Sequence, residues 1–126
     1  MAAETVVRIH DGEPEVDVSV VLPVFNEAGH LAKEISRVRD SLEASRYSFE
    51  IIVVDDGSTA GTAEVARRYG GEVRYVHQPN SGAPAARNRG AELSRGDYLA
   101  FVDSDDVWMA DKLERQIACL DNDPEV

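Results

Sequence analysis

Phe49-Glu50-Ile51-Ile52-Val53-Val54 is an almost unbroken apolar run near the middle of this 126-residue chain. Such a run is typical of a parallel β-strand that is covered on both faces of its sheet. Asp55-Asp56-Gly57 follows directly, and this combination predicts that the strand ends in a tight polar turn. The run therefore predicts a sheet with helices packed on both sides.

The same kind of segment recurs on either side of this run. We predict strands at 16–22, 49–54, 73–76 and 97–102, with Pro23 ending the first of them. We predict helices at about 27–45, 58–69 (capped by Ser58 and Thr59), 84–96 and from about 110 onward. This alternation predicts an α/β fold with a doubly wound, mainly parallel sheet of strand order 3-2-1-4. Ligands bind such sheets beyond the carboxyl ends of the strands, near the point where the order reverses.

Composition narrows the functional classes. The formal net charge of −11 argues against a nucleic-acid partner, since a duplex binder needs a basic surface. No signal peptide is visible, and the apolar run 18–22 is too short to span a bilayer. We therefore expect a cytoplasmic protein, with membrane association only through regions outside this chain. Residues 1–15 are expected to form a flexible acidic leader, and residues 16–126 one domain.

Three carboxylates crowd the end of the predicted strand 97–102, in Asp103-Ser104-Asp105-Asp106. They repel one another, and a divalent cation relieves the repulsion because Mg²⁺ and Mn²⁺ prefer oxygen ligands. An acidic turn whose aspartate caps the next helix is the alternative. Two further polar clusters, Phe25-Asn26-Glu27 and Asp55-Asp56-Gly57, also follow predicted strands and favour a functional site at this edge.

Taken together, these motifs resemble those of glycosyltransferase family 2, which has the GT-A fold. The resemblance covers roughly residues 16–120 and is carried by segments in the family's order: VVLPVFNE at 20–27, VVDDGS at 53–58, NSG and AARNRG at 80–82 and 85–90, and FVDSDD at 101–106. It implies that the chain is the nucleotide-sugar-binding part of a Rossmann-like GT-A domain, truncated after the Asp-x-Asp region.

The resemblance also implies residue roles at the nucleoside. Pro23, Phe25 and Glu27 would line the nucleoside pocket, and Asp55 would recognise the base by accepting the uracil ring N–H. A simple strand stop is an equal alternative for Pro23. Asp56 is better explained as a turn residue or as a cap of the following helix.

At the phosphates, the resemblance implies that Asn80, Gly82 and Arg87 close over the nucleotide, with the following helix offering backbone N–H groups to phosphate. A surface ion pair is the alternative for Arg87. Asp105 would ligate Mg²⁺ or Mn²⁺ at the diphosphate, and Asp103 would assist as a ligand or hold the ribose. A bound cation stabilises the charge that grows on the leaving diphosphate.

The implied activity is inverting transfer of a sugar from a nucleotide-sugar donor, expected to be UDP-linked, to a hydroxyl of a glycan, lipid-carrier or protein acceptor. The family's general base lies in the second half of its domain. We therefore expect this chain to carry the donor and metal site without a base, as a fragment or a natural truncation. The predicted strand 97–102 would keep an unpaired edge, which predicts self-association.

Other functions fit parts of the pattern. A non-catalytic nucleotide-binding module would need only the donor site. A phosphoacceptor receiver domain shares the acidic strand ends and Mg²⁺ but needs a lysine after a later strand, whereas Lys33 and Lys112 fall in predicted helices. A sugar nucleotidyltransferase would need a glycine-rich basic loop where this chain has Pro-Val-Phe-Asn-Glu at 23–27.

Overall fold

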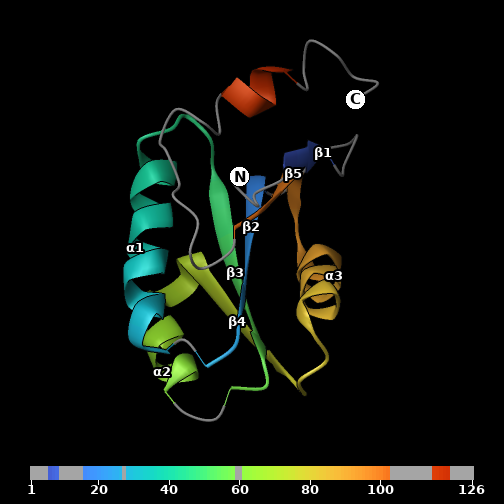
Figure 1. Cartoon of the computed structure of the whole chain (residues 1–126). Helices are drawn as coiled ribbons and strands as arrows, with labels where there is room; N and C mark the ends of the chain where they lie inside the picture. The colour runs from blue at the N-terminus through green and yellow to red at the C-terminus, as the bar shows by residue number, and fades with distance from the viewer. Residues whose placement is uncertain (1–5, 9–15, 27, 59–60, 103–114, 120–126) are drawn as a thin grey trace.

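The computed structural model describes residues 6–8, 16–26, 28–58, 61–102 and 115–119 (Figure 1). Its described strands are β1 (Val6–Arg8), β2 (Val16–Val24), β3 (Phe49–Asp56), β4 (Val73–Gln78) and β5 (Gly96–Phe101). The helices are α1 (Ala28–Glu43), α2 (Thr62–Arg67) and α3 (Ala83–Leu93), with a short 3-10 turn at Gly70–Glu72. All the strands belong to one sheet of order β1-β5-β2-β3-β4.

Strands β5, β2, β3 and β4 are parallel neighbours. The predicted doubly wound sheet and its order are therefore confirmed. Parallel pairing requires a crossover between successive strands, and α1, α2 and α3 supply these crossovers. Among the described residues, no helix is both long and apolar enough to cross a membrane.

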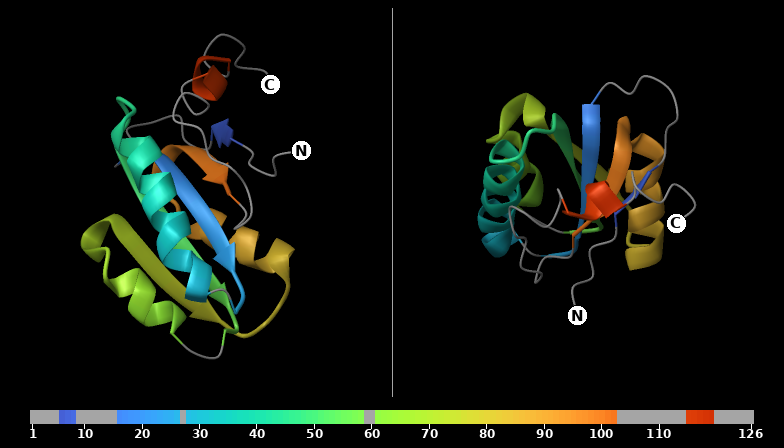
Figure 2. Two further views of the ribbon diagram at one scale, coloured as in Figure 1. Left: turned by 60° about the vertical axis from the view of Figure 1, so that its left-hand side comes forward. Right: turned by 90° about the horizontal axis from the view of Figure 1, so that it is seen from above.

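Helices α1 and α2 lie on one side of the sheet and α3 on the other (Figure 2), and each face carries its own hydrophobic core. Side chains alternate along a strand, so Ile51 and Val53 lie in the core beneath α1 and α2, whereas Ile52 and Val54 lie in the core beneath α3. The apolar stripe predicted for α1 is confirmed, since all of its members are fully buried: Leu31, Ile35, Val38 and Leu42. Ile117, in the helical segment 115–119, joins the same core.

Helix α3 lies so close to β2 that one of its positions has no room for a side chain. A Cβ atom built on Gly90 would lie 2.3 Å from Val21 Cγ1, far inside normal contact distance. Gly90 is therefore required for the packing of α3 on the sheet. This packing fixes how the N-terminal end of α3 meets the carboxyl edge of β3.

The prediction that Pro23 ends the first strand is wrong, because β2 continues to Val24 and Pro23 pairs in register with Val54. A proline in a central strand normally removes a ladder hydrogen bond. Here the Val21 carbonyl accepts from the Val102 N–H, so the backbone polar groups of Val21 point toward β5. The backbone nitrogen of Pro23, two residues later, points the same way. The last β2–β5 pair is Val21 with Phe101, so the missing N–H of Pro23 falls beyond the β5 ladder.

The start of the second helix also differs from the prediction. Helix α2 begins at Thr62, and its N-cap is Gly61, with φ +81° and no side-chain cap. The backbone N–H of Ser58 donates to Asp55 Oδ1 (2.8 Å), and its hydroxyl accepts from the Asn26 N–H (2.7 Å). Ser58 therefore ties two strand ends together in place of capping a helix.

The predicted free edge of the strand at 97–102 is occupied. Strand β1 pairs antiparallel with β5, with Val6 opposite Ala100, Val7 opposite Leu99 and Arg8 opposite Tyr98. No strand was expected within residues 1–15, because several acidic residues, a glycine and a proline occur there without a sustained apolar period. The self-association inferred from an open β5 edge loses its basis over these three positions.

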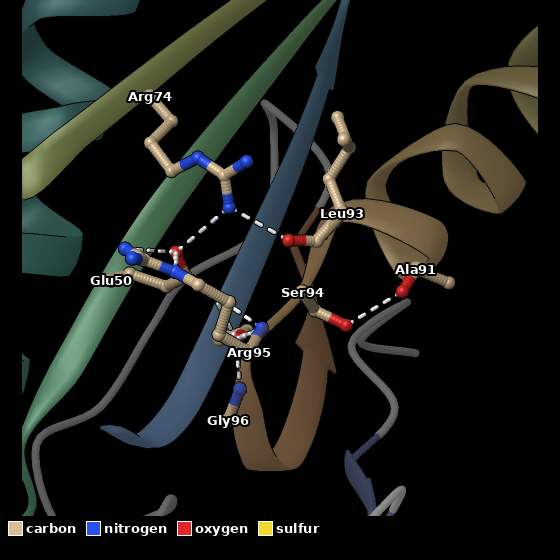
Figure 3. A network of polar contacts seen from close by, with 8 residues as sticks. Glu50, Arg74, Ala91, Leu93, Ser94, Arg95 and Gly96 are labelled. Atoms are coloured by element: carbon tan, nitrogen blue, oxygen red, sulfur yellow. Dashed lines mark hydrogen bonds and ion pairs between the residues drawn. The ribbon is translucent and has the colours of Figure 1, made fainter. Parts of the chain in front are cut away.

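At the amino edge of the sheet, a buried carboxylate joins three strands (Figure 3). Glu50 Oε1 accepts from Arg95 Nε (3.1 Å), Arg95 Nη2 (3.0 Å) and Arg74 Nη1 (3.2 Å). Glu50 Oε2 accepts from the Ser19 hydroxyl (2.6 Å) and the Arg95 backbone N–H (2.7 Å). The Ser19 hydroxyl oxygen also accepts from the Gly96 N–H at 2.8 Å.

This Glu50 network sets the charge state of its own carboxylate. Burial alone would raise the pKa of Glu50, but the bonds from Ser19, Arg95 and Arg74 outweigh burial and lower the pKa below the ordinary value of 4.5. Arg74 Nη1 also donates to the Leu93 carbonyl (2.7 Å) at the end of α3. The network thus anchors the turn between α3 and β5, the two elements that carry Arg87 and lead to Asp103.

Candidate functional site

The predicted site residues that the structure describes lie at or near the carboxyl edge of the sheet, where β2, β3 and β4 end at Val24, Asp56 and Gln78. The loops that follow these three strands meet at the lower edge in Figure 1. Among the predicted site residues, those on these strand ends, the loops and α3 are Pro23, Phe25, Asp55, Asn80, Gly82 and Arg87. Glu27, Asp103 and Asp105 lie outside the described residues.

Asp56 is the organising residue of this edge. It is only 6% exposed, and its Oδ1 accepts from Gln78 Nε2 (3.0 Å) and from the Ser81 N–H (2.8 Å). Its Oδ2 accepts from the Gly82 N–H at 2.9 Å. The bonds from Gln78, Ser81 and Gly82 lower the pKa of Asp56 below its ordinary value of 3.8, against the opposing effect of burial. The carboxylate is therefore ionised at neutral pH.

This arrangement revises one expectation. Asp56 does not cap α2; it holds the loop that leads into α3. Gly82 is the N-cap of α3, so Asp56 accepts from the two backbone N–H groups just before the helix. The phosphate-binding role predicted for the N–H groups of the helix itself stays a prediction. An anion at a helix N-terminus is favourable, and in this chain the protein supplies it.

Asp55 points to the opposite face. It continues the alternation of Ile51 and Val53, which belong to the core beneath α1 and α2. Its Oδ2 accepts from the Tyr75 hydroxyl at 2.5 Å, and its Oδ1 accepts from the Ser58 N–H. Asp55 is 1% exposed. The structure therefore does not bring Asp55 together with Pro23, which shares the face of Val21 and α3.

Tyr75 keeps its proton throughout the physiological range. Its burial and its hydrogen bond to the negative Asp55 raise the pKa of the hydroxyl to about 12. It therefore acts as a permanent donor to Asp55. Sequence reasoning missed this partner, because Tyr75 reads simply as an apolar strand residue.

Two close contacts fix the loops against each other. Gly57 has φ +93°, and a Cβ atom built on it would lie 2.9 Å from both Asn80 Cβ and Asn80 N. The β3–α2 turn therefore lies directly against the β4–α3 loop. Asn26, with φ +52°, is joined to the same turn through Ser58. The loop around Asn80 is therefore held against the β3–α2 turn, and the roles predicted for Asn80 and Gly82 at the nucleotide stay predictions.

Phe25 stands out on this edge because it is 45% exposed, the largest exposure of a bulky apolar side chain among the described residues. An aromatic ring displayed beyond a strand end is a surface on which a base or sugar can stack. Arg87 lies one turn into α3 and is half-buried. The roles predicted for Phe25 and Arg87 stay predictions.

The metal site can be tested only in part. No group of three or more His, Cys, Asp or Glu side chains suitable for a metal occurs among the described residues. The Mg²⁺ or Mn²⁺ roles predicted for Asp103 and Asp105, which lie outside the described residues, stay predictions. The described chain leads directly to them, because Val102 is fully buried and its N–H is bonded to Val21. Their carboxylate oxygens are of the kind that these cations prefer.

Comparisons with known proteins agree with this architecture. A family model described as glycosyl transferase family 2 matches residues 19–126. A putative teichuronic acid biosynthesis glycosyltransferase, TuaG of Bacillus subtilis, is 39% identical over 104 residues, which cover 79% of this chain and 40% of that protein. YibD of Escherichia coli, an uncharacterized glycosyltransferase, is 42% identical over 93 residues, which cover 71% of this chain and 26% of that protein.

Solved structures show the same fold. The mannosyltransferase PcManGT from Pyrobaculum calidifontis, in complex with GDP-Man and Mn²⁺, has a TM-score of 0.73 at 26% identity and covers 92% of this chain and 36% of its own. TarS 1–349 of S. aureus, in complex with UDP-GlcNAc, has a TM-score of 0.69 at 28% identity and covers 84% of this chain and 31% of its own. The GT-A-type fold is thereby confirmed.

The match also bears on the competing functions. The chain spans 40% or less of the length of TuaG and YibD, so it corresponds to one part of such proteins. Neither the receiver-domain nor the nucleotidyltransferase alternative has support from these relatives. With a family model that covers most of its length, the chain belongs to glycosyltransferase family 2.

Proposed function

We propose that this chain forms the donor-binding part of a family 2 glycosyltransferase and binds the nucleoside diphosphate of a nucleotide sugar together with Mg²⁺ or Mn²⁺. The proposal rests on the ordered loop at the carboxyl edge of the sheet, where Asp56 accepts hydrogen bonds from the Ser81 and Gly82 N–H groups and so holds the β4–α3 loop. A site prepared in this way binds with little loss of conformational entropy. Relatives support the class of ligand, since PcManGT holds GDP-Man with Mn²⁺ and TarS holds UDP-GlcNAc.

The base is proposed to lie on the α3 side of the edge, over Pro23 and beside Phe25. We assign base recognition to Asp56 because it is the carboxylate on that side. Its three bonds use three of the roughly four acceptor positions that a carboxylate offers, so one position remains for the base. Asp55, predicted for that role from the sequence, lies on the other face beside Tyr75 and would act by holding the β3 turn.

At the phosphates, Asp105 and Asp103 would hold the cation, and Arg87 on α3 would add positive charge. When bound, the cation would stabilise the negative charge on the departing diphosphate. The acceptor is proposed to be a glycan, lipid-carrier or protein hydroxyl. No described residue is assigned as the general base, so we propose that this chain alone binds donor without efficient transfer.

Calorimetric titration with UDP and GDP, with and without Mn²⁺, tests the proposal. The wild type should bind a nucleotide more tightly when Mn²⁺ is present, and Asp105→Ala should lose that metal dependence. Asp40→Ala is the matched control, since Asp40 is an exposed aspartate on α1, away from the carboxyl edge. Absence of metal-dependent binding by the wild type would refute the donor site.

A second set of variants addresses the base. Asp56→Asn should weaken nucleotide binding more than Asp55→Asn does, once both are compared at equal folded fraction by circular dichroism. A larger loss in Asp55→Asn would return base recognition to Asp55. Sugar transfer by this chain with a turnover typical of enzymes, on the order of 1 per second or more, would contradict the expected lack of transfer.

A further inference from the structure

Gln78 is a side chain on the carboxyl edge to which the sequence motifs assign no role. It is the last residue of β4, is half-buried, and pairs in register with Asp56 on β3. Its Nε2 lies 3.0 Å from Asp56 Oδ1. An ionised carboxylate can only accept hydrogen bonds, so the amide must present its NH₂ group to Asp56. The orientation of the Gln78 amide is thereby determined by chemistry.

The partners of Asp56 leave it a defined remaining capacity. A carboxylate has about four acceptor positions, two on each oxygen. Both positions on Oδ1 are taken, by Gln78 Nε2 and by the Ser81 N–H. One position on Oδ2 is taken by the Gly82 N–H. A single acceptor position therefore remains on Asp56, and it lies on Oδ2.

Nucleobases differ in how many donors they present to such a group. Uracil offers one ring N–H between two carbonyl oxygens. Guanine offers a ring N–H with an adjacent amino group, and two neighbouring donors are best matched by two acceptors. A base donor that is buried without an acceptor costs affinity. One remaining acceptor therefore suits uracil better than guanine.

We propose that Gln78 gives this donor site a preference for uracil nucleotides over guanine nucleotides, by occupying an acceptor position of Asp56 that guanine would need. Gln78 is thus a positioning residue that acts through Asp56. The inference rests on the proposed function, in which Asp56 faces the base. It adds a determinant that family membership does not supply, since PcManGT holds a guanine nucleotide and TarS a uracil nucleotide.

The test is the ratio of UDP affinity to GDP affinity, measured by calorimetry with saturating Mn²⁺. Gln78→Leu removes the amide at similar size and frees one position on Asp56 Oδ1. The UDP-to-GDP affinity ratio should fall by about tenfold, which corresponds to one hydrogen bond. Gln78→Met, an unbranched apolar side chain of similar length, provides a second variant in case the first folds poorly, and it should show the same shift.

Ser81→Ala is the matched control in the same loop. It removes the bond from the Ser81 hydroxyl to the Pro79 carbonyl (2.8 Å) but keeps the backbone N–H that donates to Asp56. A change in loop rigidity alone would alter both affinities together, so Ser81→Ala should leave the ratio unchanged. A purely structural role of Gln78 would likewise leave the ratio unchanged.

Three outcomes oppose the proposal. If the wild type binds UDP and both Gln78 variants have the same UDP-to-GDP affinity ratio as the wild type, the role of Gln78 is overturned and the donor site still stands. A wild type that prefers GDP would overturn the acceptor count on which the inference depends. A wild type that binds neither nucleotide would overturn the donor site and this inference together.

Discussion

The Tyr75 hydroxyl donates to Asp55 on one face of the sheet, while the neighbouring Asp56 accepts from the α3 loop on the other face. Two adjacent carboxylates therefore serve separate sets of partners. Asp55 joins β3 to β4 and to its own turn, whereas Asp56 organises the edge proposed to meet the nucleotide. Substitutions that remove partners of Asp55 should therefore lower mainly the stability of the fold, whereas substitutions at the edge held by Asp56 should lower mainly nucleotide affinity.

Tyr75→Phe should destabilise the fold. The variant removes the hydroxyl that donates to Asp55 and leaves the carboxylate, which is 1% exposed, with one bond fewer. We expect a loss of about 1–3 kcal/mol in the free energy of unfolding, the cost of an unpaired buried acceptor, measured by urea denaturation. Tyr47→Phe is the control, because the Tyr47 hydroxyl has an exposed contact with Arg46 at 3.3 Å. Equal losses in the two variants would contradict a special role for Tyr75.

Gly57→Ala should disturb the contact between the two loops. An alanine there would be strained at φ +93° and would place its Cβ 2.9 Å from Asn80, so we expect a loss of about 1–3 kcal/mol with weaker nucleotide binding. Gly29→Ala is the opposite control, since α1 leaves open space at that position, and it should stabilise the fold by about 0.4–1 kcal/mol. Thermal unfolding compares the two, and a tolerated Gly57→Ala would show that the loops do not depend on this contact.

Phe25→Ala should lower nucleotide affinity while sparing stability. Phe25 is 45% exposed, so truncation should change the free energy of unfolding by no more than about 0.5 kcal/mol. Loss of a stacking surface should reduce UDP binding by about 1–3 kcal/mol, as measured by calorimetry. Val24→Ala, at a 4% exposed position, should show mainly a stability loss. Unchanged UDP affinity in Phe25→Ala would place the base away from this ring.

Glu50 should make the fold sensitive to acid. Its pKa is lower in the folded chain than the ordinary value of 4.5, so its contribution to stability is complete above that value. The contribution is lost as the pH falls through the lowered pKa of the folded state. Urea denaturation between pH 7 and pH 3 should therefore show a steeper acid loss in the wild type than in Glu50→Gln.

At neutral pH, Glu50→Gln should itself cost about 1.5–3 kcal/mol, because it weakens charge-assisted bonds to Arg74 and Arg95. Solvent moderates this cost, since the two arginine side chains are 33% and 44% exposed. Glu43→Gln is the matched control, because its carboxylate is 56% exposed and lies 3.7 Å from Arg39. That variant should change stability by less than about 1 kcal/mol. Parallel acid profiles for the wild type and Glu50→Gln would assign the acid loss to other groups.

The parallel sheet could be predicted from the sequence because each strand is a compact apolar run between polar turns. The sequence could not predict which face of the sheet each side chain of β3 occupies. Every residue from Ile51 to Asp56 is buried, so the apolar pattern has no polar side that would show which of Asp55 and Asp56 lies under α3. That choice depends on which face of the sheet α3 covers, and α3 packs on the face of Val21, in close contact through Gly90.

The partners of the site carboxylates were equally hidden. Tyr75 and Gln78 meet Asp55 and Asp56 only because β4 pairs with β3 in one particular register, with Val53 opposite Tyr75 and Asp56 opposite Gln78. A shift by one residue would reverse the facing side chains. The end of β2 was predicted wrongly for a related reason. The missing N–H of Pro23 costs no ladder hydrogen bond, because the β5 ladder has already ended at that position.

Strand β1 pairs with the outer edge of β5, which is therefore not free to accept another strand at these positions. The outer side of β5 offers its backbone groups to one neighbour at a time, and Val6–Arg8 already holds that place at 98–100. A strand from a second molecule, or from a longer version of this protein, would have to expel β1 before it could join the sheet. Three residues form few ladder hydrogen bonds, so we expect a competing strand that pairs with more of β5 to displace β1.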